Sequence, residues 1–464
     1  MSKRLVIIGA GAAGTAAALE AARAGAEVTL VEKGTPGGNW LAADLMPSKV
    51  YLTAAQSLEH AGLLARKGMA PESSAAAGAT TIDLAALLRW KEDAIAGATA
   101  ALARRLVEAG VRLVPGVARL AGAGRVEVVG GKASGAASAL TLEADVTIVA
   151  TGSRPRRNPS FNYDGKRVFT TKEAFAGGQP PGRVLIVGSG PSGVEFAYLY
   201  HRLGVKVTFL VSRGHLLPHE DDDVAAVVQG AFLERGMEVF PNTRVVSLDA
   251  ANGGGVLARA EDGREFAADA ALVSIGQEPY TGNLGLESVG AAVDQRGRIP
   301  VDQFQRTPAA GVYAAGDVTG KFMLASVAAR QGTVAARHAL GLATEPVRYD
   351  AIASGIFAEP QVCSVGVTEG YARWKQLPVK VYKAPFAGNL KAGLEERGAG
   401  FIKVVTDAAG GRVLGGSVVG PEASEVVATL SLAVRAQATV EALREAVYIT
   451  PSFAETLGRL ESVG

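Results

Sequence analysis

The sequence contains few of the residues that build metal clusters and disulfide frameworks. It has one cysteine, Cys363, and five histidines in 464 residues. A single cysteine cannot form an intrachain disulfide or a cysteine-based zinc cluster, and this scarcity suits a reducing compartment. We therefore expect no metal site and a cytoplasmic protein.

An excess of charge of either sign is also missing. Charged residues make up 20% of the chain, and the formal net charge is +2. Proteins that bind nucleic acid or anionic membranes usually carry a clear basic excess. We expect no nucleic-acid partner, and a small neutral or anionic ligand instead.

Long apolar runs are scarce too. The apolar run Leu5–Ile8 leads into an alanine-rich stretch, but Glu20 and Arg23 interrupt it. The ~20 apolar residues that a membrane span needs are not reached. The glycines that follow the run mark a strand-to-helix turn and not a signal peptide. We therefore expect no membrane span. The length of the chain is sufficient for roughly three domains.

The chain does contain a repeated strand, turn and helix pattern. The first copy is a strand at Arg4–Ile8, a turn at Gly9–Gly14, a helix at Thr15–Ala24 and a strand at Glu27–Val31. The second copy has the same elements at Arg183–Val187, Gly188–Gly193, Val194–Arg202 and Lys206–Leu210. Each copy is typical of a βαβ unit. The repeat predicts an α/β fold with two Rossmann-like nucleotide-binding domains.

The first glycine turn has the spacing that holds a dinucleotide. Gly9 permits a tight turn, Gly11 lets the backbone approach a pyrophosphate, and Gly14 allows the helix to pack closely. Glu32, at the end of the second strand, can accept hydrogen bonds from a ribose diol. The strand, turn, helix, strand and acid together make this match specific.

The second turn repeats the glycines at 188, 190 and 193 but lacks the acid. Its second strand is followed by Val211, Ser212 and Arg213. An acid at this position would repel a 2′-phosphate, so its absence favours NADPH, or use of both NADPH and NADH. The alternative is that Arg213 is an ordinary solvated charge.

The pattern changes at about Tyr349. Strand-like runs at Phe401–Val405 and Val413–Val419 precede helical patterns at Glu422–Ala436 and Val440–Ala446, which predicts a C-terminal α+β domain. Small-residue stretches at Met69–Thr80, Ala121–Ala139 and Ala251–Gly255 are expected to be surface loops.

Several motifs together resemble one family. Ala150-Thr151-Gly152, Ala314-Ala315-Gly316-Asp317 and Leu324-Ala325 resemble flavin-side motifs, and Phe357–Pro360, Val365–Glu369 and Gly420–Glu425 resemble an interface domain. The chain is similar to the pyridine nucleotide-disulfide oxidoreductases of dihydrolipoamide dehydrogenase type. That resemblance implies a glutathione-reductase-like fold, bound FAD and a homodimer. It implies an FAD domain at 1–152 and 277–345, an NAD(P) domain at 153–276 and a dimerisation domain at 346–464.

The resemblance and the fingerprints also imply which residues bind the cofactors, FAD and NADPH or NADH. These residues are Gly9, Gly11, Ala13, Gly14, Glu32, Lys33, Gly38, Lys49, Ala118, Thr151, Gly152, Asp317, Leu324, Ala325, Gly188, Gly190, Pro191, Ser192, Gly193, Ser212, Arg213 and Gly276.

Two departures from the family's pattern concern thiol chemistry. The segment Gly37–Lys49 resembles the redox-active stretch GGxCxxxxCxPSK, with Trp40 and Leu45 in place of both cysteines. Near the C-terminus, Thr450 replaces the histidine that serves as acid/base for thiols in the family. A threonine hydroxyl is not a proton acceptor at neutral pH. Reduction of dihydrolipoamide, glutathione or mercuric ion is therefore disfavoured.

The flavin-side ion pair is retained. In the family, a lysine at the position of Lys49 lies beside flavin N5 and pairs with an acid at the position of Glu195. A cation there stabilises the negative charge of a reduced isoalloxazine, so Lys49 and Glu195 are the expected catalytic residues. The alternative for Glu195 is an acid near a helix start that interacts with the helix dipole.

The groups that are retained and the groups that are missing together predict the function. Nicotinamide and flavin sites persist while the thiol groups are gone, so hydride should pass from NAD(P)H through FAD to a quinone-like or other soluble acceptor, as in a quinone reductase or diaphorase. A soluble pyridine nucleotide transhydrogenase is the first alternative, and a catalytically vestigial FAD-binding interaction protein is the second.

The expected acceptor pocket consists of Trp40, Leu45 and Thr450. Trp40 either forms a wall for a planar acceptor or only fills the space that the cysteines would leave. We assign no role to Glu455. Cys363 is expected to be a small buried residue, and the acids at 219–223 are explained by the start of a helix.

Overall fold

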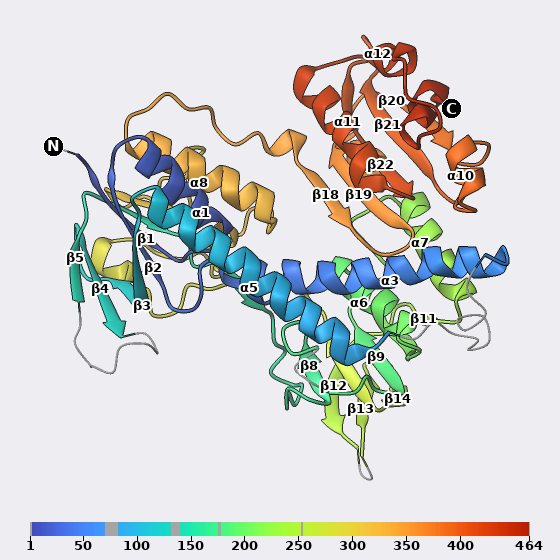
Figure 1. Cartoon of the computed structure of the whole chain (residues 1–464), viewed down its shortest axis with the longest axis horizontal. Coiled ribbons are helices and arrows are strands. Elements are labelled where there is room, and N and C mark those ends of the chain that lie inside the picture. Colours follow the sequence, from blue (N-terminus) through green and yellow to red (C-terminus); the bar gives the residue numbers. More distant parts are fainter. Residues whose placement is uncertain (1, 70–81, 131–139, 175–177, 252–253, 464) are drawn as a thin grey trace. The chain divides into compact units, whose positions relative to one another are not determined.

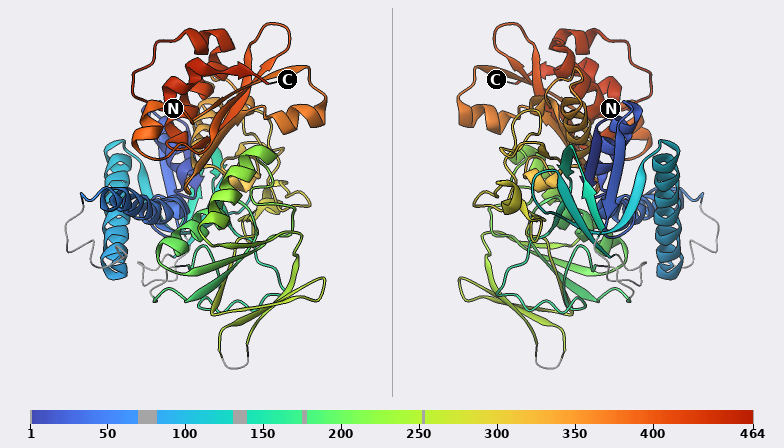
Figure 2. Two further views of the ribbon diagram at one scale, coloured as in Figure 1. Left: turned by 90° about the vertical axis from the view of Figure 1, so that its right-hand side faces the viewer. Right: turned by 90° about the vertical axis from the view of Figure 1, so that its left-hand side faces the viewer.

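The computed structural model describes residues 2–69, 82–130, 140–174, 178–251 and 254–463. The grey traces in Figures 1 and 2 mark the other residues. The described chain forms two compact units. The first comprises 1–47, 88–156 and 276–347, and the second comprises 48–87, 157–275 and 348–464. The expected loop at 69–80 falls almost entirely outside the described residues.

The first unit is built on a seven-stranded sheet. Its strands lie in the order β17, β6, β1, β2, β3, β4, β5. β17 to β3 run parallel, and β3, β4 and β5 pair antiparallel. The bounds are β1 Arg4–Ile8, β2 Glu27–Glu32, β3 Arg112–Leu120, β4 Arg125–Gly130, β5 Leu140–Glu143, β6 Val146–Val149 and β17 Val312–Ala314. A two-stranded antiparallel ladder joins β7 (Ser153–Pro155) to β16 (Gln277–Pro279).

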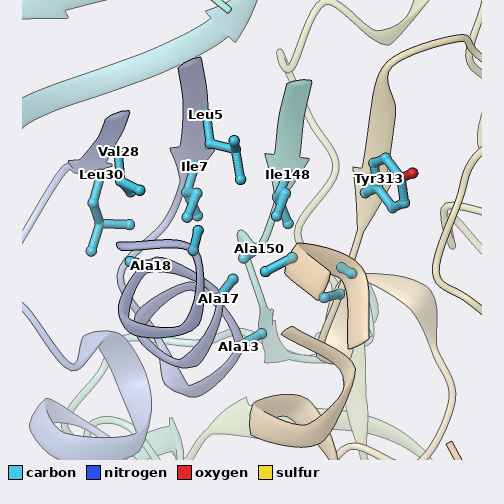
Figure 3. Packing of buried hydrophobic residues seen from close by; sticks show 14 of the residues in the cluster. Leu5, Ile7, Ala13, Ala17, Ala18, Val28, Leu30, Ile148, Ala150 and Tyr313 are labelled. Carbon is cyan, nitrogen blue, oxygen red and sulfur yellow. The ribbon is translucent and has the colours of Figure 1, made fainter. Parts of the chain in front are cut away.

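Helices α1 (Ala12–Arg23) and α8 (Ala325–Ala339) pack on one face of this sheet. Figure 3 shows the core between α1 and the sheet: Leu5, Ile7, Leu30, Ile148 and their neighbours point from adjacent strands toward Ala13, Ala17 and Ala18. The alanines let the helix approach closely, and Gly332 does the same for α8, because a Cβ there would lie 2.0 Å from Ala13 O. The short helix α2 (Gly38–Ala42) follows β2.

Two helices carry the chain between the units. The chain enters the second unit within α3 (Leu45–Arg66) and returns within α5 (Leu84–Glu108).

The second unit contains a five-stranded parallel sheet in the order β11, β10, β9, β15, β8, and a three-stranded antiparallel sheet, β12 to β14. The bounds are β8 Val168–Thr170, β9 Arg183–Val187, β10 Lys206–Leu210, β11 Glu238–Phe240, β12 Val245–Ala250, β13 Val256–Ala260, β14 Glu265–Ala268 and β15 Ala270–Val273. Its helices here are α6 (Pro191–Arg202) and α7 (Asp222–Glu234).

The rest of the second unit is a six-stranded antiparallel sheet in the order β18, β19, β22, β21, β20, β23, with α11 across it (Figure 1). The bounds are β18 Ala353–Ile356, β19 Gln361–Gly366, β20 Val379–Pro385, β21 Phe401–Asp407, β22 Val413–Gly420, β23 Glu461–Ser462, α9 Glu369–Lys375, α10 Leu390–Leu394, α11 Ala423–Ala436 and α12 Val440–Glu445. Lys403, 1% exposed, pairs here with Asp221, Asp223 and Glu369.

Both predicted βαβ units are present, with two differences from the sequence analysis. α1 begins at Ala12 and α6 at Pro191, three residues earlier than expected in each case, because the last part of each glycine turn is already helical. Proline suits the first helical position, where its missing N–H costs nothing. The expected loop at 121–139 is wrong for β4, whose alternating Val126 and Val128 are buried; 131–139 lie outside the described residues.

Candidate active site

The first glycine turn closes onto the sheet at two glycines and stays open at the third. A Cβ on Gly9 would lie 2.4 Å from Ala150 O, and one on Gly14 would lie 1.8 Å from Gly9 O. A Cβ on Gly11 would meet nothing within 4 Å. Gly11 is the N-cap of α1, where backbone N–H groups have no partner within the helix. This open helix N-terminus fits a pyrophosphate.

The acid after β2 also holds the turn. Glu32 Oε2 accepts a hydrogen bond from the Ala10 N–H at 2.7 Å, and Oε1 accepts one from the Gly34 N–H at 2.8 Å. Each carboxylate oxygen keeps a further lone pair, which can accept from a ribose hydroxyl. Next to it, Lys33 Nζ lies 3.9 Å from the centre of the Tyr280 ring.

A half-buried carboxylate, Asp317, follows the Ala314-Ala315-Gly316 part of its motif. Asp317 accepts a hydrogen bond from Ser153 Oγ at 2.6 Å. Burial raises the pKa of Asp317, and the Ser153 hydroxyl offsets part of that effect. A partly buried carboxylate with one short partner gains from further hydroxyl donors. The residues present therefore fit a flavin with its ribityl chain.

Other residues of the first unit support this arrangement. Asn39 Nδ2 donates to Ser153 O, Thr151 Oγ1 donates to Tyr280 O, and the Gly316 N–H donates to the buried Gln331 side chain. The expected cofactor residues Ala13 and Ala118 are buried, in α1 and β3. Leu324 caps α8, and Ala325 begins it. Gly152 and Gly276 both have positive φ.

Trp40 and Leu45, which replace the two cysteines, lie in α2 and at the start of α3. Gly37, in the left-handed region, precedes α2 and donates its N–H to Ala10 O. A Cβ on Gly38 would lie 3.3 Å from Gly11 Cα, so α2 packs onto the glycine turn. Trp40 Nε1 is buried, and no hydrogen-bond partner reaches it within the described part of the chain. Leu45 is 39% exposed.

The second glycine turn repeats the geometry of the first. A Cβ on Gly188 would lie 2.1 Å from Ser274 O, one on Gly193 would lie 3.3 Å from Ile186 Cγ2, and one on Gly190 would meet nothing within 4 Å. Pro191 and Ser192 begin α6, and Ser189 O accepts from the Leu217 N–H. Ser212 and Arg213 are exposed. The second unit thus has its own open helix N-terminus.

Lys49 and Glu195 meet, although 146 residues separate them. Lys49 Nζ lies 2.8 Å from Glu195 Oε1 and 2.9 Å from Oε2. The Glu195 side chain is 10% exposed and that of Lys49 is 29% exposed. Both carboxylate oxygens of Glu195 therefore lie within hydrogen-bonding distance of the ammonium, and water screens this ion pair only in part. Glu195 therefore has a side-chain partner in addition to any interaction with the helix dipole.

Thr450 has a defined partner in the second unit. Its Oγ1 donates a hydrogen bond to Glu455 Oε2 at 2.6 Å, and Asn389 Nδ2 lies 3.3 Å from Glu455 Oε1. The apolar side chains of Val447 and Ile449 on either side of Tyr448 are 101% and 82% exposed. Thr450 therefore lies in an exposed, apolar part of the chain.

Cys363 and the acids that follow His219 have defined surroundings in the second unit. Burial raises the pKa of the Cys363 thiol to about 12, so it stays protonated and unreactive at neutral pH. Of the acids near His219, Asp221 and Asp223 pair with Lys403. Within the described ranges, no group of three or more histidine, cysteine or acidic residues is arranged to hold a metal ion.

Sequence reasoning missed three supporting residues. Ser153 directly follows the Ala150-Thr151-Gly152 motif, and Asn39 lies inside the segment that replaces the redox-active stretch, so position alone could have suggested both. Phe357, expected only as part of the interface domain, donates its N–H to Glu195 Oε1 at 2.9 Å. The sequence showed only that an aromatic residue occupies this position of an interface motif, and such a pattern does not reveal which residue it contacts.

Comparisons with known proteins agree with this geometry. The family model for pyridine nucleotide-disulphide oxidoreductases matches residues 3–332, and the model for that family's dimerisation domain matches residues 352–460. The chain is a pyridine nucleotide-disulphide oxidoreductase. It is therefore an oxidoreductase and a flavoprotein that uses FAD and NAD(P)H, which confirms the expected family, cofactors and glutathione-reductase-like fold.

Individual relatives of this oxidoreductase carry two different names. A Mycobacterium tuberculosis protein named NAD(P)H dehydrogenase (quinone) is 35% identical over 98% of this chain and 93% of its own length. The dihydrolipoyl dehydrogenase of Haloferax volcanii is 34% identical over 98% of this chain and 94% of its own. The crystal structure of LpdA from Mycobacterium tuberculosis is 34% identical, with a TM-score of 0.89 over 98% of this chain and 99% of that one.

Among the helices that the structure describes, none is both long enough and apolar enough to cross a bilayer.

Proposed function

We propose that this flavoprotein is an NAD(P)H:quinone oxidoreductase of the diaphorase type, working in the cytoplasm. The observation that carries the proposal is the retained Lys49–Glu195 pair in a chain whose redox-active positions are Trp40 and Leu45. Thiol reduction needs sulfur at those positions. The relative named NAD(P)H dehydrogenase (quinone) supports the choice of acceptor.

The chain's residues have separate tasks in this proposal. Bound FAD supplies the capacity to take two electrons from a nicotinamide and deliver them to an acceptor. The turn at Gly9–Gly14, with Glu32 and Asp317, binds and orients it. Lys49 stabilises negative charge at the isoalloxazine, and Glu195 keeps the lysine in place.

The nicotinamide side is assigned to the second glycine turn. Gly190 leaves room for the pyrophosphate at the N-terminus of α6. Arg213 is exposed beside Ser212 where an acid would otherwise repel a 2′-phosphate. We propose that the donor is NADPH, either alone or together with NADH.

The acceptor side is assigned to Trp40, Leu45 and Thr450. Thr450 would come from the second subunit of a homodimer, and the exposure of Val447 and Ile449 beside it supports such an interface. Because the Thr450 hydroxyl donates to Glu455, it gives this position no basic nitrogen. A thiol substrate needs such a base to lose its proton, whereas a quinone has no proton to lose.

Steady-state assays of the FAD-loaded enzyme test the proposal. We expect NADPH to bleach the flavin absorbance anaerobically and a panel of quinones to restore it at a rate that supports turnover. Rapid hydride exchange from NADPH to NAD⁺ with negligible quinone turnover would establish a transhydrogenase. Such an enzyme must bind both nicotinamides, and Ser212 and Arg213 are compatible with that requirement. A flavin that NADPH and NADH both fail to bleach would establish a vestigial enzyme.

The acceptor pocket has its own test. Trp40→Phe keeps an aromatic ring and removes the indole N–H, while Leu45→Val trims the neighbouring side chain. If both line the pocket, the variants lower kcat/KM for quinones and leave the rate of flavin reduction by NADPH unchanged. Unaltered kcat/KM in both would show that the residues only fill space.

A further inference from the structure

Phe357 lies between β18 and β19, and its backbone is held from two sides. Its N–H donates to Glu195 Oε1 at 2.9 Å, and its carbonyl accepts from Gln56 Nε2 at 3.3 Å. Glu195 belongs to α6 and Gln56 to α3. Both helices therefore fix the position of this residue.

The ring of Phe357 is held as well. Gly355, two residues earlier, has no side chain, and a Cβ there would lie 3.4 Å from Phe357 Cε2. The ring thus packs over a glycine. It also carries the Lys49 ammonium, whose nitrogen is 4.4 Å from the ring centre. At this distance an aromatic face attracts a cation.

The Lys49 ammonium therefore contacts both a carboxylate and an aromatic ring. The two Glu195 oxygens accept hydrogen bonds from it, and the Phe357 ring lies beneath it. An ammonium has three N–H donors on a flexible four-carbon stem. A carboxylate and an aromatic face together restrict that stem, so that the cation is held in one place before any ligand arrives.

We propose that Phe357 is a positioning residue for Lys49: its ring holds the ammonium and its N–H orients Glu195, so that the cation stays beside the reduced flavin. The inference rests on the proposed role of Lys49. It gives a residue within the range that matches the dimerisation-domain model a role in positioning Lys49.

The test is the equilibrium midpoint potential of the FAD-loaded enzyme, titrated against a reference dye without nicotinamide or quinone. Phe357→Leu removes the aromatic face and keeps the backbone N–H. We expect the equilibrium constant for flavin reduction to fall about 5-fold, the factor of an ordinary cation–π contact, which is about 20 mV for a two-electron couple. Phe357→Tyr, which keeps an aromatic face, should restore most of the loss.

A matched control and a second background separate positioning from general damage. Phe266→Leu removes another partly buried ring of the same unit that also carries a cation, Arg264, at 5.6 Å, and it should leave the potential unchanged. In a Lys49→Met background, Phe357→Leu should have no further effect, because a coupled pair is not additive. An equal shift in both backgrounds, or none in either, overturns the proposal.

The outcomes also distinguish this inference from the proposed function. If Lys49→Met alone leaves the potential unchanged, the role of Lys49 falls, and that of Phe357 falls with it. If the quinone assays fail while the coupled shift is observed, Phe357 still positions Lys49 and only the acceptor is wrong. Should Phe357→Leu not retain FAD, Phe357→Met, of similar volume, carries the same test.

Discussion

Alanine substitutions at Gly188 and Gly190 of the second turn should have different effects: the first should lower stability, and the second should weaken dinucleotide binding. At Gly188 the backbone has φ +126°, and a Cβ would lie 2.1 Å from Ser274 O. An L-residue in this region costs about 1–3 kcal/mol, and relief of the overlap costs a further ~1–3 kcal/mol. Gly188→Ala should therefore lose a large part of the ~5–15 kcal/mol that stabilises a typical domain.

At Gly190 the same substitution meets no obstacle within the protein. Its φ is −80°, its ψ is −179°, and a Cβ would have nothing within 4 Å. The free energy of unfolding should change by only about 0.5 kcal/mol. In the proposed role of this turn, however, the added methyl group would occupy the space through which the α6 N-terminus approaches the dinucleotide phosphates. Loss of one or two charge-assisted hydrogen bonds, ~1.5–3 kcal/mol, raises the dissociation constant of NADP⁺ about 10- to 100-fold.

The assay combines thermal unfolding with calorimetric titration of NADP⁺ into the FAD-loaded enzyme. Gly230→Ala is the control, since Gly230 lies inside α7 and a Cβ there would also meet nothing within 4 Å. It should keep the NADP⁺ affinity and raise the free energy of unfolding by up to about 1 kcal/mol, because alanine is the better helix former. Wild-type affinity in Gly190→Ala would refute the assignment of this turn to the nicotinamide dinucleotide. Equal destabilisation by Gly188→Ala and Gly190→Ala would refute the steric argument.

Three further predictions follow from individual contacts. Arg213→Ala should raise the KM for NADPH relative to NADH, and an unchanged ratio in steady-state assays would show that Arg213 is only a solvated charge. Asp317→Asn should weaken FAD binding about 10- to 100-fold in equilibrium dialysis, as loss of a charged hydrogen bond does. Because the folded pKa of Asp317 is raised from 3.8, its contribution to stability falls as pH rises from about 3.8 through the folded pKa, and Asp317→Asn should remove that slope in unfolding experiments. Lys403→Met should lower the free energy of unfolding by about 3–5 kcal/mol, because three carboxylates lose their buried cation. Burial alone would raise the pKa of Asp223, but Lys403 and Lys383 hold it below its usual value of 3.8. The cost should therefore shrink as the pH falls from about 3.8 through this lowered pKa, because a protonated Asp223 no longer needs the cation; a pH-independent cost would contradict this explanation.

Local patterns in the sequence were sufficient to locate the two glycine turns. Each depends on glycines whose φ angles and close approaches are set within a few residues, so spacing alone identifies them. Helix starts were less accurate, because the helices begin inside the glycine turns at Ala12 and Pro191. β4 was missed because its small neighbours concealed the alternation of Val126 and Val128.

The sequence by itself determined the fold class, the cofactor turns and the absence of the redox-active cysteines, since each of these is a matter of residue type and local spacing. Only the tertiary structure decided which distant groups meet. Lys49, Glu195 and Phe357 come from α3, α6 and the β18–β19 connection, and their contact depends on how helices and sheet pack over hundreds of residues. No local pattern encodes such a meeting, because a side chain's partners are chosen by the packing of whole elements and not by its neighbours in sequence.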